Sequence, residues 1–168
     1  MTIPAREARF RELLERSHAR WAGIARAYAE ARDRDDLVQE IALQVWQNLD
    51  RFTGRSSLDT WAYRVALNTA LAWRRKVATR TKKLTQSTAN IAELPGDRGS
   101  EDDVQRVLDR FLTSLSDGDR AVLLLYLDGL SHDDAAEVIG ISEGAYRTRL
   151  HRVRRHFEET HCQEEFVP

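Results

Sequence analysis

Apolar residues recur at spacings of three and four along the first part of the chain. One series is Phe10, Leu13, Leu14, Trp21, Ile24, Ala25 and Tyr28, and a second is Leu37, Ile41, Val45, Trp46 and Leu49. This spacing puts the apolar residues on one face of an α-helix, and nothing in this part alternates with the period of two that a strand requires. Because Gly23 and Gly54 are the only glycines before residue 95, we predict long helices at about 5–31, 35–50 and 58–76.

Residues 77–103 differ in composition from the segments on either side. A basic run leads into polar residues, then Pro95 and Gly96, and then an acidic cluster at 101–103; the run is Arg74, Arg75, Lys76, Arg80, Lys82 and Lys83. This composition offers too little apolar surface for a core, so we predict a flexible linker at 81–102 between two modules. The alternative is a long surface loop inside one domain, but loops of this length without secondary structure are uncommon.

Helix start and stop signals divide the rest of the chain. After a predicted helix near 103–114, Ser116 and Ser131 each have an aspartate three residues later, which is the pattern of an N-terminal cap. Gly129 and Gly140 are placed to end the helices that these serines begin, and Ser142 begins the last helix. A turn of about three residues around Gly140 joins the last two helices, which predicts a helix-turn-helix motif.

The last helix of this motif has an apolar face and a cationic face. We expect an inward face of Tyr146, Leu150, Val153 and Phe157, and an opposite face of Arg147, Thr148, His151, Arg154 and Arg155. Residues 142–156 hold five arginines and a single acid, Glu143, so pairing within the helix leaves most guanidinium groups uncompensated. A solvated surface helix is the alternative, but a helix-turn-helix places this helix in the major groove of DNA.

Position along the helix separates expected base contacts from expected phosphate contacts. Arg147, Thr148 and His151 lie where side chains reach base edges, and arginine can pair bidentately with guanine. Phosphate contacts are expected from a second set, which is Ser131, Arg149, Arg152 and Arg154. An ordinary surface histidine is the other interpretation of His151, whereas metal binding is disfavoured because no other ligand lies at helical spacing.

Three segments of the chain carry a family resemblance. Residues 115–131, with the helix-turn-helix after them, are similar to region four of bacterial sigma factors, and residues 36–46 and 60–75 are similar to region two. A region two, a short linker and a region four with nothing else resemble the extracytoplasmic-function (ECF) class, and the match covers about nine tenths of the chain. It implies an all-α protein with two small helical domains, a three- to four-helix region-two domain and a four-helix region-four domain, at 1–80 and 103–160, followed by a tail at 161–168.

The resemblance also implies a function. ECF sigma factors are not enzymes; they bind core RNA polymerase and direct initiation by reading the minus-35 and minus-ten promoter elements and assisting melting. We therefore expect a cytoplasmic protein whose partners are core RNA polymerase, promoter DNA and an anti-sigma factor. No cofactor or metal is implied.

The same resemblance assigns roles to three sets of residues. Polymerase binding is assigned to Asp36, Leu37, Gln39 and Glu40. Minus-ten binding is assigned to Phe52, Trp61, Tyr63, Arg64, Asn68, Arg74 and Arg75. Minus-35 binding is assigned to Ser131, Glu143, Arg147, Thr148, Arg149, His151 and Arg152.

The chemistry of some of these residues suits the assigned role, and some have another interpretation. An aromatic Phe52 suits the flat face of a flipped base, and the amide of Asn68 suits its hydrogen-bonding edge. Trp61 and Tyr63 are candidates to hold the separated strand, but we expect at least one of them to pack in the core instead. The polar surface around Asp36 has the alternative of an ordinary solvated acidic face.

Two features depart from the family pattern. Tyr146 stands where family members often have a smaller β-branched residue, so neither the depth of the recognition helix nor its base preference can be transferred. The tail after Phe157 is acidic, and we expect it to be disordered rather than folded over the neighbouring arginines.

The net charge of -1 conceals a division along the chain. Residues 1–83 carry 17 Lys and Arg against 10 Asp and Glu, whereas residues 84–168 carry 9 against 17. A basic first half is typical of a protein that meets a polyanion, and halves of opposite charge are expected to attract each other. The chain has no apolar run long enough for a membrane span, and its single cysteine, Cys162, excludes an internal disulfide.

Two other functions stay open at this level. An autonomous helix-turn-helix regulator would dimerise through its N-terminal helices and bind a palindromic duplex without polymerase. A metal-dependent enzyme would use an acidic cluster, either Asp35, Asp36 and Glu40 or His132, Asp133 and Asp134. Neither cluster is joined by ligands from a second helix, so this alternative is remote.

Overall fold

The computed structural model describes residues 3–85 and 100–161, and the regular structure within these ranges is all helical. The N-terminal part contains α1 (Ile3–Tyr28), α2 (Arg34–Asn48) and α3 (Leu58–Thr85), with short 3-10 turns η1 (Ala31–Asp33) and η2 (Leu49–Arg51) around α2. The C-terminal part contains α4 (Ser100–Ser114), α5 (Asp117–Leu127), α6 (His132–Ile139) and α7 (Glu143–His161). None of these helices is long and apolar enough to cross a bilayer.

The first module is built from α1, α2 and α3, which all pack against one another. Its core consists of residues that the helical spacing selects, including Leu13, Trp21, Ile24, Leu37, Ile41 and Val45. The largest difference from the predicted boundaries is at the end of α3, which continues to Thr85 instead of ending near residue 76. Residues 77–85 contain neither glycine nor proline, so nothing in them stops the helix.

Helical structure therefore reaches into both ends of the predicted linker at 81–102. Residues 86–99, where we predict flexibility, lie outside the described residues, and so do residues 162–168 with Cys162. The acidic tail was expected to be disordered after Phe157, but its first part is helical, because α7 continues to His161 and Glu159 pairs with Arg155 at 2.7 Å.

The second module confirms the predicted caps. The Ser116 and Ser131 hydroxyl oxygens accept hydrogen bonds from the backbone N–H groups of Asp119 (3.2 Å) and Asp134 (3.1 Å). Each cap satisfies a backbone donor that the first turn of a helix leaves without an intrahelical partner. Gly140 ends α6 in the left-handed region, with a φ of 79° that side chains with a Cβ rarely adopt. The turn it makes leads directly into α7, as a helix-turn-helix requires.

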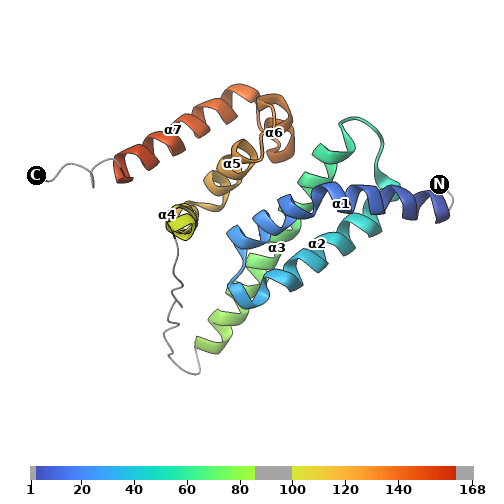
Figure 1. The fold of residues 1–168 in the computed structure, drawn as a ribbon, viewed down its shortest axis with the longest axis horizontal. Coiled ribbons are helices and arrows are strands. Elements are labelled where there is room, and N and C mark those ends of the chain that lie inside the picture. The colour runs from blue at the N-terminus through green and yellow to red at the C-terminus, as the bar shows by residue number, and fades with distance from the viewer. Residues whose placement is uncertain (1–2, 86–99, 162–168) are drawn as a thin grey trace, which may run out of the picture.

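The two modules lie against each other rather than apart. Figure 1 shows α6 beside the first turns of α3, and the contacts also join α1 to α4 and α5. The buried apolar residues of both modules belong to a single cluster, which runs from Leu13 in α1 to Val153 in α7. The arrangement brings part of the first module's surface into contact with the second, including residues predicted to bind DNA.

Candidate nucleic-acid interface

The recognition helix α7 separates its apolar and cationic faces as predicted. Tyr146, Leu150 and Val153 are buried. Phe157 is 36% exposed and packs edge-on against Phe111 of α4, with ring centroids 4.9 Å apart. The opposite face leaves six predicted DNA-contacting or cationic residues exposed, which are Arg147, Thr148, His151, Arg152, Arg154 and Arg155. The helix is therefore held by one face and offers the other to a ligand.

Tyr146, the departure from the family pattern, is fully buried beneath α7. Its hydroxyl donates a hydrogen bond to the Val122 carbonyl oxygen in α5 at 3.2 Å, and its ring lies 5.6 Å from the His132 ring in α6. Burial raises the pKa of Tyr146 to about 12, so the phenol stays protonated and keeps donating. The larger side chain thus ties α7 to α5 and α6.

Arg147 is the exposed arginine nearest the start of α7. Its side chain is 62% exposed, and its guanidinium pairs with Glu143 one turn earlier at 2.6 Å. Arg147 Nε also donates to His132 Nδ1 at 3.2 Å, across the turn of the helix-turn-helix. Both partners restrict where the guanidinium lies, and both leave part of it free for a base edge.

Arg149 points toward the start of α5 instead of outward. Arg149 Nε donates to Asp119 Oδ1 at 2.6 Å, and a Cβ at Gly118 would lie 2.5 Å from Arg149 Nη2, so the guanidinium lies over a position with no side chain. Burial by itself would raise the pKa of the Asp119 carboxyl, but the hydrogen bonds from Arg149 and Ser116 outweigh it and hold that pKa below its ordinary value. No sequence pattern indicates this pairing, because the spacing of Asp119 from Ser116 predicts only a helix cap.

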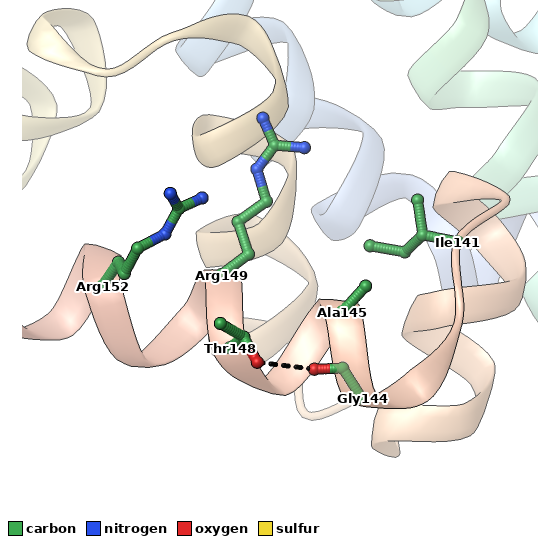
Figure 2. Close-up of a pocket in the computed structure, with 6 residues that line it drawn as sticks. All are labelled: Ile141, Gly144, Ala145, Thr148, Arg149 and Arg152. Carbon is green, nitrogen blue, oxygen red and sulfur yellow. Dashed lines mark hydrogen bonds between the residues drawn. The ribbon is translucent and has the colours of Figure 1, made fainter.

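A shallow groove runs along the first turns of α7. Figure 2 shows Ile141, Gly144 and Ala145 beside it, with Arg149 and Arg152 rising from the helix on one side. Gly144 and Ala145 are exposed and small, so a DNA backbone or base edge can approach the helix closely there.

Two predicted contacts in this region already bond within the protein. The Thr148 hydroxyl donates to the Gly144 carbonyl oxygen at 2.9 Å, so it offers its methyl group and its acceptor lone pairs outward (Figure 2). The Ser131 hydroxyl donates to Asp134 Oδ2 at 2.6 Å while it caps α6. A phosphate contact from Ser131 would have to replace that bond.

In the first module, two of the predicted minus-ten residues, Phe52 and Trp61, pack against each other. Their ring centroids are 5.6 Å apart, and the Arg9 guanidinium lies 5.0 Å from the Phe52 ring centroid. Asn68 is exposed on α3, two turns after Trp61, and Arg75 is exposed further along the same helix. The first module thus carries an aromatic pair, an exposed amide and cations, which are the kinds of group that bind single-stranded DNA in other proteins.

Three other predicted minus-ten residues contact the second module. We expected at least one of Trp61 and Tyr63 to pack in the core, and Tyr63 is buried. Its hydroxyl donates a hydrogen bond to Asp128 Oδ2 at 2.7 Å. Arg64 pairs with Glu137 at 3.2 Å, and Arg74 pairs with Asp117. The charge division along the chain pointed to such attraction, but no sequence pattern identified the acidic partners.

The predicted polymerase-binding residues separate by burial. Asp36 and Gln39 are exposed on α2, and Glu40 is half-buried and accepts a hydrogen bond from Gln44 Nε2 at 3.0 Å. Leu37 is fully buried among the core residues. Leu37 therefore packs beneath the exposed polar surface of α2 and is not itself accessible to a partner in this conformation.

The comparisons with known proteins follow the same division into two modules. Residues 13–81 match the family model for Sigma-70 region 2, and residues 105–157 match the model for Sigma-70, region 4. The chain belongs to the ECF class of sigma-70 factors. This ECF sigma factor is 27% identical over 161 residues to the ECF RNA polymerase sigma-E factor of Haemophilus influenzae, with 89% of this chain and 85% of the relative covered. It is 29% identical over 157 residues to that of Escherichia coli, with 86% and 82% covered.

Solved structures share the fold across both modules. The sigma factor RpoE from Bartonella quintana, solved in complex with the anti-sigma factor NepR, gives a TM-score of 0.72 at 25% identity and covers 89% of this chain and 94% of that one. CnrH, solved in complex with the cytosolic domain of CnrY, gives a TM-score of 0.67 at 24% identity, with 92% and 88% covered. These matches confirm the all-α fold with two helical regions.

Membership in this class establishes what kind of protein this is. The ECF sigma factor is a transcription initiation factor that works with RNA polymerase, and it is not an enzyme. Membership in this family decides against the two alternative functions, the autonomous regulator and the metal-dependent enzyme. Within residues 3–85 and 100–161, no group of three His, Cys, Asp or Glu side chains is placed to hold a metal ion.

Proposed function

We propose that the second module of this sigma factor reads the minus-35 element as duplex DNA. The observation that carries the proposal is the exposed start of α7, where Arg147, Thr148 and His151 lie on the face away from the core. Arg147 and His151 supply donors for base edges in the major groove, and Arg152 supplies charge for the flanking phosphates. Arg149 contributes to phosphate binding only after it leaves Asp119, or through its charge alone.

The first module, in this proposal, binds the minus-ten element as a separated strand. The Phe52 and Trp61 rings provide an apolar surface for an unstacked base, and the exposed amide of Asn68 provides a donor and an acceptor. Arg75 is exposed to hold backbone phosphates, and Tyr63, Arg64 and Arg74 become available once their contacts with the second module break.

The proposed partners follow from the same surfaces and from the relatives. Asp36, Gln39 and Glu40 form the surface that we propose to bind core RNA polymerase, and we propose that the protein acts in the cytoplasm with it. The Bartonella quintana neighbour was solved with an anti-sigma factor, and we propose a partner of this class here as well.

Run-off transcription tests the proposal. Core polymerase is incubated with genomic promoter fragments of the encoding organism, with and without the sigma factor, and the transcripts are mapped. We expect initiation at specific sites only when the protein is present, with a shared sequence near position -35 and another near -10. Palindromic duplex binding by the protein alone, without any protein-dependent transcript, would contradict the proposal.

A further inference from the structure

Two side chains on the first turns of α3 donate hydrogen bonds to carboxylates of the second module. The Tyr63 hydroxyl donates to Asp128 Oδ2 at 2.7 Å, and the Thr60 hydroxyl donates to Asp134 Oδ1 at 3.1 Å. Asp128 lies at the end of α5 and Asp134 in the first turn of α6. Hydrogen bonds therefore join the start of α3 to the connection between α5 and α6.

Ion pairs continue this contact along α3. Arg64 donates to both the backbone carbonyl oxygen and the carboxylate of Glu137 in α6, the latter at 3.2 Å. Further along the helix, Arg74 pairs with Asp117 at the start of α5. The first module supplies hydroxyl groups and cations, and the second supplies carboxylates, which is the direction of attraction expected from the opposite charges of the two halves.

The contact covers residues that the promoter strand would need. Tyr63 is 3% exposed, so neither its ring nor its hydroxyl is open to a base in this arrangement. Arg64 and Arg74 would have to leave their carboxylates before they could bind phosphates. By contrast, Asn68 and Arg75 are exposed on the same helix, so only part of the proposed minus-ten surface is covered.

We propose that this contact is a latch that keeps the free sigma factor closed and lowers its activity until the modules separate. The latch consists of Thr60, Tyr63, Arg64 and Arg74 on α3 with Asp117, Asp128, Asp134 and Glu137 on the second module. The inhibitory role of the latch depends on the proposed promoter contacts of α3. The closed arrangement of the two modules does not depend on them. The acidic side chains act as an internal substitute for DNA phosphates on α3.

The strengths of these contacts suit a reversible latch. The Arg64–Glu137 pair is about 40% exposed on each side, so solvent and salt screen it. The bond from Tyr63 to Asp128 is more buried and joins a neutral donor to a charged acceptor, which makes it one of the stronger single contacts. Removing it is expected to shift the ratio of closed to open molecules by roughly tenfold.

Closure is tested by pulsed electron paramagnetic resonance on the full chain. Spin labels are attached to Q47C in α2 and E158C in α7, two exposed positions outside the latch, after Cys162→Ser removes the native thiol. We expect one narrow distance distribution for the otherwise unchanged protein. Asp128→Ala and Glu137→Arg should each add a second, broader distribution, and so should raised salt.

Two matched variants separate the latch from general effects of mutation. Asp128→Asn keeps an oxygen that accepts the Tyr63 hydrogen bond, so it should retain the narrow distribution that Asp128→Ala loses. Asp133→Arg makes the same kind of charge change one turn earlier on α6, at an exposed residue that is not the ion-pair partner of Arg64, and it should also leave the distribution narrow. A broad distribution in the unchanged protein, or equal broadening by both arginine variants, would overturn closure.

The inhibitory role is tested with run-off transcription at limiting core polymerase. We expect Asp128→Ala and Glu137→Arg to raise transcript yield about threefold to tenfold over the unchanged protein, while Asp128→Asn and Asp133→Arg do not. Equal yields from all variants would overturn inhibition even if the distances show closure. Absence of transcript from every protein, including the unchanged one, would overturn the proposed function and the inhibitory role together, and the distance measurement would still decide closure.

Discussion

Arg120 of α5 donates a hydrogen bond from Nη1 to the carbonyl oxygen of Ala27, near the end of α1, at 2.9 Å. The same guanidinium donates to carbonyl oxygens at the end of α4 and just after it, those of Leu112 at 2.6 Å, Thr113 at 3.0 Å and Leu115 at 3.2 Å. The last carbonyls of a helix have no intrahelical donor, so one buried side chain completes the ends of two helices from different modules. Burial lowers the pKa of Arg120, which is 3% exposed.

Replacing this arginine is expected to destabilise the protein strongly. Arg120→Met fills a similar volume but leaves several carbonyl oxygens buried without donors, which should lower the free energy of unfolding by about 2–4 kcal/mol. Urea denaturation followed by circular dichroism measures the change. Arg110→Met, at an exposed position of α4, is the control and should alter stability by less than about 0.5 kcal/mol. Equal losses from the two variants would contradict the role of Arg120.

The burial of Asp128 predicts a specific pH dependence. Burial raises the pKa of this carboxyl, while the Tyr63 hydroxyl and the charge of Arg20 partly oppose the rise. The folded protein then holds a proton on Asp128 more tightly than the unfolded chain does. Its contribution to the free energy of unfolding falls as pH rises from the ordinary carboxyl value of 3.8 through the raised pKa.

Asp128→Asn should remove this dependence because the amide does not titrate. The stability of the variant relative to the unchanged protein is expected to increase with pH across that window and then to level off. Urea denaturation at a series of pH values, with Asp133→Asn as the exposed control, measures the difference. A stability difference between Asp128→Asn and the unchanged protein that stays constant with pH would show that burial does not raise the pKa of this carboxyl.

The caps and the two faces of α7 could be predicted from the sequence because their causes are local. A serine three residues before an aspartate caps the start of both α5 and α6, and Gly140 ends α6 in the left-handed region. The end of α3 lies beyond the predicted one, because the basic residues after position 76 include no glycine or proline that would stop the helix.

The partners across the two modules could not be predicted in this way. Tyr63 and Asp128 are 65 positions apart, and their contact depends on how two folded units dock. The division of charge indicated attraction, yet it gave no preference for Asp128 over Asp133 as a partner. Similarly, the spacing that put Leu37 on the apolar face of α2 conflicted with its assigned role in polymerase binding, and the structure buries it.

Arg147 and Arg149 are expected to differ in their effect on promoter recognition. Arg147→Ala should weaken binding of the holoenzyme to its own minus-35 sequence by about 1–3 kcal/mol, with a smaller loss on a substituted sequence, because it removes a base contact. Arg149→Ala should weaken binding equally on both sequences, since Arg149 adds charge near phosphates and is held by Asp119. Fluorescence anisotropy with the two duplexes measures both. An equal loss from Arg147→Ala on both sequences would reduce Arg147 to a phosphate contact.

Asn68→Ala tests the minus-ten pocket. The side chain is exposed on α3, so its removal should leave the fold and polymerase association unchanged while it relaxes base preference at one minus-ten position. Transcription from a set of promoters with every base at each minus-ten position measures the preference. Ala72→Ser, at another exposed position of α3, serves as the control. An unchanged preference at all positions would remove Asn68 from the pocket.

The surface of α2 gives the sharpest test of polymerase binding. Asp36 and Gln39 are exposed and lie three residues apart, so they occupy neighbouring positions on one side of the helix. Replacing both with alanine should weaken association with core polymerase by about 1–3 kcal/mol, because it removes polar contacts at an interface without disturbing the buried Leu37 beneath. Titration of labelled sigma factor with core polymerase gives the affinity, and Gln47→Ala, exposed near the other end of α2, is the control. If the double variant binds as tightly as this control, the residues form an ordinary solvated face, and the polymerase must contact the first module elsewhere.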